Sequence, residues 1–214
     1  MPDLDACHVF VCGRTRSGKT RAELARALSH PGPVLFINTQ DETMGAGWVL
    51  AGPHDRVSSL LRALRAGRRV AFLPAAYPPT AVRELQALVA VLFGAAPWPR
   101  PVLLIVDEAH VFAPQGSPPG ALHRVALRGL RWGLQLVLIS PRPAIVDKGL
   151  VTQCALHRIF ATSWEGSYFA SHGVPAEKVK AILDAAGRWS YVVFDGASVA
   201  GPFRENISYP LQDP

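Results

Sequence analysis

The feature that most constrains this chain is the alternation of short apolar segments with longer segments of helical periodicity. The short segments are rich in Val, Ile, Leu and Phe. Several are apolar on both faces, which is typical of strands buried in a parallel sheet. This alternation predicts an α/β fold with a mostly parallel sheet between helices. The expected strands are residues 7–12, 33–38, 69–73, 101–106, 134–140 and 156–161.

Helical patterns fill the intervals between these strands. One of them is expected to begin at a capping Thr80 and to end at Gly94. The C-terminal segment differs, because two β-type runs flank Asp195-Gly196, a pair typical of a hairpin turn. We expect this hairpin to add antiparallel strands at one sheet edge. The expected helices are residues 18–29, 56–66, 80–93, 120–132 and 175–185.

Length and composition limit the possible classes of protein. The chain has 214 residues, of which 49% are hydrophobic and 18% charged, as in a globular protein with a substantial core. No linker, repeat or low-complexity tract divides it, so we predict a single domain over residues 1–214. No apolar run reaches the ~18 residues of a membrane-spanning helix. The acidic N-terminus does not suit a secretory signal, and Cys7, Cys12 and Cys154 form no disulfide framework, so we expect a cytoplasmic protein.

Residues 13–20, GRTRSGKT, match the phosphate-loop pattern G-x-x-x-x-G-K-[ST] in full, between a predicted strand and a predicted helix. The glycines let the backbone wrap closely around an anion, so that successive N–H groups point at phosphate. The N-terminus of the helix adds its positive end. Lys19 can reach the β- and γ-phosphates of ATP, and the Thr20 hydroxyl can bind Mg²⁺. The predicted nucleotide-binding residues are Gly13, Arg14, Thr15, Arg16, Ser17, Gly18, Lys19 and Thr20.

An acid pair, Asp107 and Glu108, directly follows the apolar run of residues 102–106. The carboxyl ends of parallel strands meet at one sheet edge, so we expect this pair beside the phosphate loop. Asp107 is predicted to hold Mg²⁺, and Glu108 to act as the general base for the attacking water. A glutamate beside the metal-binding aspartate suits hydrolysis, which favours an ATPase over a small-molecule kinase.

A further block of the sequence carries Arg131-Trp132-Gly133, Ser140-Pro141-Arg142-Pro143 and the stretch from Asp147 to Gln153. Together with the phosphate loop and the acid pair, this block resembles the FtsK/HerA superfamily of DNA-translocating ATPases. The resemblance covers about residues 8–20 and 102–162. It implies a P-loop NTPase fold of the RecA/FtsK type.

The resemblance also implies how ATP is hydrolysed. In the superfamily the site lies at subunit interfaces of a homo-oligomeric ring, a pentamer or hexamer, and an Arg from the neighbouring subunit completes it. Arg131 and Arg128 are the first candidates for this residue, and Arg142 is the third. The family's sensor Gln would fall at Pro141, which has no side-chain hydrogen-bonding group. Ser140 and Gln153 are therefore the alternatives for contacting the γ-phosphate or the attacking water.

A bare core of this size looks most like the genome-packaging ATPases of membrane-containing icosahedral viruses and phages. That resemblance implies double-stranded DNA as a partner, with a capsid vertex or membrane proteins as further partners, in the host cytoplasm. A cellular or conjugative DNA pump and a nucleotide-dependent assembly scaffold without motor activity remain alternatives.

The net charge of +6 is compatible with DNA binding. Candidate DNA contacts are the arginines of residues 56–69 and the loops 74–79 and 113–120. His110 is expected to serve packing or the surface rather than to couple the nucleotide to a neighbouring strand. Trp132, Trp164 and Trp189 are expected to be core or interface aromatics.

Overall fold

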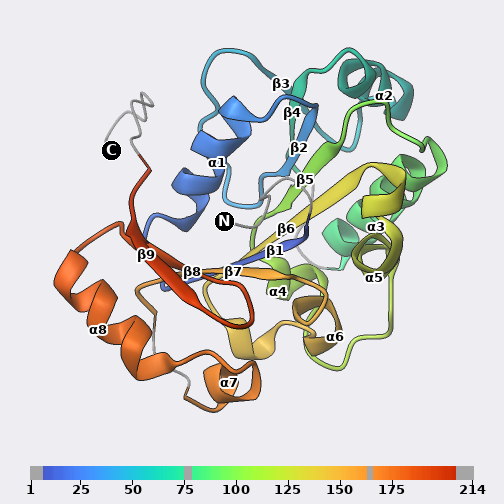
Figure 1. Cartoon of the computed structure of the whole chain (residues 1–214). Coiled ribbons are helices and arrows are strands. Elements are labelled where there is room, and N and C mark those ends of the chain that lie inside the picture. The colour runs from blue at the N-terminus through green and yellow to red at the C-terminus, as the bar shows by residue number, and fades with distance from the viewer. Residues whose placement is uncertain (1–6, 75–78, 163–165, 206–214) are drawn as a thin grey trace.

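A nine-stranded sheet runs through the part of the chain that the computed structural model describes, residues 7–74, 79–162 and 166–205 (Figure 1). Seven neighbouring strands are parallel, and the last two pair antiparallel at one edge. This arrangement confirms the predicted fold class and the C-terminal hairpin. Across the sheet the order is β3 (Trp48–Ala51), β4 (Arg69–Phe72), β2 (Val34–Ile37), β5 (Val102–Val106), β6 (Leu134–Ser140), β1 (Val9–Cys12), β7 (Leu156–Phe160), β8 (Tyr191–Phe194) and β9 (Val199–Phe203).

Helices cover both faces of this sheet (Figure 1). Alternate residues of each strand point to opposite faces, so Val9 and Val11 pack with α1 (Lys19–Ser29), while Phe10 joins the larger core on the other face. That larger core includes apolar side chains from α2 (Val57–Arg65), α3 (Thr80–Gly94), α5 (Ala121–Arg128) and α8 (Ala176–Ala186). All five helices occur in predicted helical segments, and four of them, α1, α2, α3 and α8, match the predicted bounds to within one or two residues.

The predicted helix over residues 120–132 is wrong in its last four residues, 129–132. Helix α5 ends at Arg128, and a 3-10 turn, η1 (Leu130–Trp132), follows. The chain turns back so tightly that a Cβ on Gly129 would lie 2.5 Å from the Val125 carbonyl oxygen and 2.7 Å from that of Leu134. A glycine at position 129 therefore lets the backbone of Val125 and that of Leu134 approach it closely, which a residue with a Cβ would prevent.

Thr80 does not cap α3. It is the first helical residue, and Pro79 occupies the preceding cap position without a side-chain hydrogen bond. Proline suits this position because it has no N–H group to leave unpaired.

Several short elements escape the sequence analysis. Strand β3 is half exposed and only four residues long, so it lacks the strongly apolar pattern of the other parallel strands. The additional helices are α4 (Ala109–Phe112), α6 (Lys148–Val151), α7 (Gly166–Ser171) and the 3-10 turn η2 (Pro143–Ile145). No helix in the described ranges is long and apolar enough to cross a bilayer.

Candidate nucleotide site

The phosphate loop joins β1 to α1 and is held in one shape by its glycines. Gly13 has a φ of 157°, and a Cβ there would lie 2.6 Å from the Phe160 Cβ. Gly18 has a φ of 97° at the N-cap of α1. The Arg14 N–H donates to the Ala161 carbonyl oxygen at 2.8 Å, which ties the loop to the end of β7. These constraints leave a concave backbone that is suited to an anion.

Strand register brings the other predicted groups to the same end of the sheet, where the parallel strands have their carboxyl ends. Cys12 lies beside Ser140, and Val106 lies beside Leu138, so the residues that follow β1, β5 and β6 share that edge. A cleft of about 500 Å³ opens there between the phosphate loop and the acid pair. Its lining includes Lys19, Thr20, Gln40, Asp107 and Glu108. The structure thus brings together the two sequence motifs that were expected to meet.

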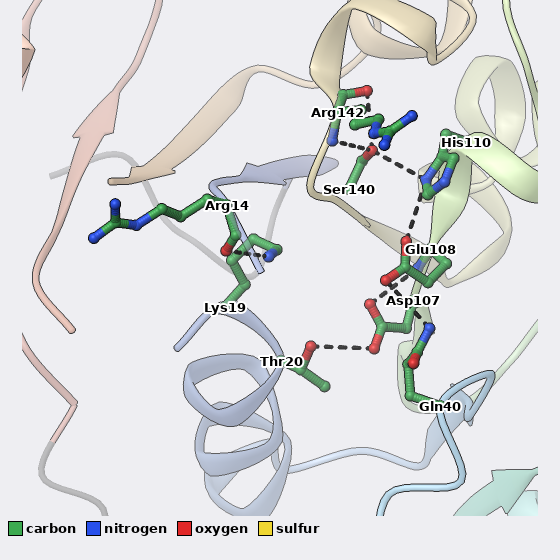
Figure 2. A network of polar contacts seen from close by, with 9 residues as sticks. All are labelled: Arg14, Lys19, Thr20, Gln40, Asp107, Glu108, His110, Ser140 and Arg142. Atoms are coloured by element: carbon green, nitrogen blue, oxygen red, sulfur yellow. Dashed lines mark hydrogen bonds and ion pairs between the residues drawn. The ribbon is translucent and has the colours of Figure 1, made fainter. Parts of the chain in front are cut away.

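Asp107 and Thr20 form the candidate cation site. The Thr20 hydroxyl donates to Asp107 Oδ2 at 3.1 Å, and the Glu108 N–H donates to Asp107 Oδ1 at 2.9 Å (Figure 2). Burial, reinforced by the charge of Glu108, raises the pKa of Asp107 to about 6. A buried carboxylate beside a hydroxyl fits Mg²⁺, which binds through one or two protein oxygens and otherwise keeps water and phosphate ligands. In the described residues no cluster of three or more His, Cys, Asp or Glu forms another metal site.

Lys19 is buried at the base of the cleft. Its Nζ donates to the Arg14 carbonyl oxygen at 3.0 Å, while the Arg14 side chain extends away from the acid pair (Figure 2). Burial lowers the pKa of Lys19, and the charges of Asp107 and Glu108 oppose that shift. The ammonium group is therefore a desolvated cation that an incoming phosphate would stabilise.

Glu108 adopts a left-handed backbone conformation, with φ 51° and ψ 44°, at the start of α4. This conformation costs a non-glycine residue roughly 1–2 kcal/mol. The carboxylate has a partner on each side: Gln40 Nε2 donates to Oε1 at 3.4 Å, and His110 Nδ1 lies 3.3 Å from Oε2 (Figure 2). Strain at a residue that projects a carboxylate into a cleft is typical of a functional position.

Ser140 extends the network around Glu108. Its hydroxyl lies 3.4 Å from His110 Nδ1, accepts from the Arg142 N–H and donates to the Arg142 carbonyl oxygen, both at 3.1 Å (Figure 2). The Arg142 side chain lines a second hollow of about 640 Å³, together with Glu108 and His110. His110 thus connects the acid pair to the end of β6, contrary to the packing or surface role expected for it.

Three sequence candidates lie elsewhere. Gln153 is exposed and precedes β7, so it stands at the sheet edge opposite the phosphate loop and cannot reach the γ-phosphate of its own subunit. Arg128 and Arg131 are exposed and precede β6, so they also lie at the end of the sheet away from the phosphate loop. Gln153 is therefore wrong as a sensor within the subunit, because strands in a parallel sheet begin at the edge away from the site.

The sequence analysis missed Gln40, and for His110 it favoured packing or the surface over the link to the neighbouring strand. Gln40 lies in the polar stretch that follows β2. Polar residues at the carboxyl end of a buried parallel strand are a usable signal, because every such end faces the same edge. The signal for His110 is weaker, since its partner Ser140 is thirty positions away.

Comparison with solved structures identifies the fold. The genome packaging NTPase B204 from Sulfolobus turreted icosahedral virus 2, in complex with AMPPCP, superposes with a TM-score of 0.67 at 15% identity, covering 94% of this chain and 100% of that one. The same protein with ATP-gammaS gives a TM-score of 0.65 at 13% identity, with the same coverage. EssC (ATPases 2 and 3) from Geobacillus thermodenitrificans gives 0.52 at 8% identity, covering 92% of this chain and 39% of that one.

Sequence comparison gives two local matches. The DNA double-strand break repair helicase HerA of Pyrococcus furiosus is 39% identical over 56 residues, which is 25% of this chain and 10% of that protein. The probable helicase MJ1565 of Methanocaldococcus jannaschii is 37% identical over 59 residues, or 26% and 12%. The matches thus span only about a tenth of the length of these relatives. No protein-family profile matches the chain.

The sheet, the phosphate loop and the acid pair at its edge define a P-loop NTPase. Within that class, the two local matches and the shared fold make the chain similar to P-loop ATPases of the FtsK/HerA type.

Proposed function

We propose that this protein hydrolyses ATP to move double-stranded DNA, as the motor of viral genome packaging, within a homo-oligomeric ring. The observation that carries the proposal is the juxtaposition of a complete phosphate loop with Asp107 and Glu108, joined by the hydrogen bond from Thr20. The fold shared with a genome packaging NTPase over 94% of the chain supports the packaging role.

Each group at the edge has a chemical task in this proposal. The loop N–H groups and Lys19 bind the phosphates, and Thr20 and Asp107 would hold Mg²⁺. Mg²⁺, when bound, neutralises charge on the phosphate oxygens. Glu108 accepts a proton from the attacking water, and Gln40 and His110 orient its carboxylate.

The catalytic arginine comes from a neighbouring subunit. Arg128 and Arg131 are exposed at the sheet edge opposite their own site, so they are free to contact another copy. An arginine supplied in this way is worth about 10³–10⁵-fold in rate in related reactions. Arg142 ranks third for this role. It lines the hollow beside Glu108 of its own subunit, whereas the role requires an arginine that reaches a neighbouring subunit.

DNA is proposed to contact basic side chains and exposed loops of the protein. The arginines of residues 56–69 are candidates, as is the loop 113–120. Residues 75–78 of the candidate loop 74–79, and Trp164, lie outside the described residues. Arg69 is used elsewhere, because its guanidinium donates to the carbonyl oxygens of Ala27 and Leu28.

A cellular DNA pump of the HerA type is the second candidate. The 39% identity to a repair helicase over 56 residues favours it, although that stretch is a quarter of the chain. The packaging motor and the cellular pump would hydrolyse ATP in the same way, and they differ in the proteins with which the motor would assemble.

The test is ATP turnover measured with and without double-stranded DNA, alongside the mass of the protein in solution. We expect turnover that DNA stimulates and a mass of several subunits. A monomer without turnover in the presence of DNA would contradict the motor proposal. For the trans arginine, mixing Arg131→Ala with Lys19→Ala subunits should restore part of the lost turnover, and verified mixed rings without rescue would exclude Arg131.

A further inference from the structure

Trp189 is the most unusual surface residue near the phosphate loop. Its side chain is 59% exposed, although tryptophan is usually well buried, and its backbone has a left-handed φ of 64°. The sequence analysis expects a core or interface aromatic here. The Arg188 guanidinium carbon lies 5.7 Å from the centroid of the ring, which otherwise remains largely exposed beside the phosphate loop. A strained backbone conformation beside a binding site is typical of a functional position.

The position of Trp189 is fixed by sheet register. Tyr191 at the start of β8 pairs with Phe160 at the end of β7, and the Ala161 carbonyl oxygen that follows accepts a hydrogen bond from the Arg14 N–H of the phosphate loop at 2.8 Å. Strand β1, which leads into that loop, lies between β7 on one side and β6 and β5 on the other. Trp189 and Glu108 therefore flank the phosphate loop from opposite sides.

This arrangement sets the direction of a bound nucleotide. Its γ-phosphate must face Glu108 if Glu108 is to activate water, so the phosphate chain leads away from the acid pair. The nucleoside end then leaves the loop on the side of β7 and β8, where Trp189 stands. The Trp189 ring reaches the loop itself, because a Cβ on Gly18 would lie only 3.3 Å from Trp189 Cδ1.

A small, largely apolar hollow of about 160 Å³ lies on this side of the loop. It is too small for a whole nucleotide and suits a planar ring. Arginine side chains and one carboxylate surround the apolar surface, which offers both stacking and hydrogen bonding to a heterocycle. Its lining is Gly18, Arg21, Ala22, Trp189, Arg204 and Glu205.

The walls of the hollow are held in place before any ligand binds. Arg204 Nε donates to the Ser190 hydroxyl at 2.9 Å, and its Nη2 donates to the Ala186 carbonyl oxygen. The Tyr191 hydroxyl donates to Glu205 Oε1 at 2.7 Å. These bonds connect the end of β9 to both sides of Trp189, so the ring is presented by an ordered frame.

We propose that Trp189 is the stacking platform for the purine base of the bound nucleotide, with the base in the hollow between Trp189 and the start of α1. The inference rests on the proposed nucleotide site and adds to it the residue that recognises the base. An aromatic platform of this kind is tolerant of the base it holds but not of the loss of its ring.

The test compares ligands with and without a base. Dissociation constants for ATP and for inorganic tripolyphosphate, both with Mg²⁺, are measured for the wild type, Trp189→Asn and Trp189→Tyr. Asparagine tolerates the left-handed backbone, so Trp189→Asn removes the ring with little effect on the fold. Trp132→Asn is the matched control, since Trp132 is also exposed but lies at the opposite sheet edge.

We expect Trp189→Asn to weaken ATP binding by about tenfold and to leave tripolyphosphate binding unchanged, with Trp189→Tyr restoring most of the loss. Trp132→Asn should bind both ligands like the wild type. Equal weakening of both ligands, or no weakening of either, would overturn the base platform while the proposed ATPase site stands. A wild-type protein that binds neither ligand would overturn both.

Discussion

At the scale of single residues, the site depends on how Glu108 is held. Its backbone is in a costly conformation, and its carboxylate lies between Gln40 and His110. His110 in turn contacts Ser140 at the end of the neighbouring strand. A change at the tip of β6 can therefore move the carboxylate without any change in the phosphate loop.

We predict that His110→Asn lowers kcat for ATP by about three- to tenfold with little change in KM, because one hydrogen bond to Glu108 is worth about 0.5–1.5 kcal/mol. His110 acts through Glu108 and does not line the cleft beside the phosphate loop, so binding should be spared. Steady-state kinetics with saturating Mg²⁺ measure the effect. A raised KM with an unchanged kcat would contradict a positioning role.

The phosphate loop and the acid pair could be predicted from the sequence because each is a contiguous motif at the end of an apolar strand. The roles of Gln40 and Trp189 could not, and the link through His110 could be named but not preferred, since each depends on contacts between segments far apart in the chain. The pairing of strands that are distant in the chain creates those contacts.

At the scale of elements, the turn between α5 and β6 shows how one residue ends a helix. The local pattern favours helix through residue 132, but Gly129 packs against the backbone of Val125 and Leu134. Strand β3 was missed for a related reason, because it is short and half exposed and, among the described residues, pairs with β4 alone. Propensity alone does not reveal such tertiary constraints.

Gly129→Ala should therefore lower the free energy of unfolding by about 1–3 kcal/mol, since the added methyl group must displace backbone atoms. Gly94→Ala is the matched control. It lies at the end of α3 with nothing within 4 Å of an added Cβ, so the change should be neutral or stabilising by up to about 1 kcal/mol. Urea denaturation of both variants tests the comparison, and equal stabilities would refute the close-approach explanation.

At the scale of the whole molecule, burial of titratable groups links stability to pH. His157 lies in β7 among the rings of Phe10, Phe194 and His172. Burial, with a smaller contribution from the charge of His172, lowers the pKa of His157 to about 4. An unfolded chain binds a proton at this residue near pH 6.5, whereas the folded protein does not.

The contribution of His157 to the free energy of unfolding is thus fully present above about pH 6.5. It is lost as the pH falls toward 4, by an amount on the order of 3 kcal/mol. His157→Phe keeps an aromatic ring and removes the titration. We expect the variant to lose less stability than the wild type between pH 7 and pH 4.5 in urea denaturation. Parallel losses in the two proteins would show that His157 does not contribute.

The proposed ATPase activity depends on Glu108, which would activate water at a site built from the phosphate loop and Asp107. The most direct measurement is the rate of ATP hydrolysis by Glu108→Gln, with double-stranded DNA present, together with its affinity for ATP. Glutamine keeps the size and the hydrogen-bonding ability of the side chain but cannot accept the proton. We predict that ATP affinity is retained and that turnover falls by about 10²–10⁴-fold, whereas turnover equal to that of the wild type would contradict the account.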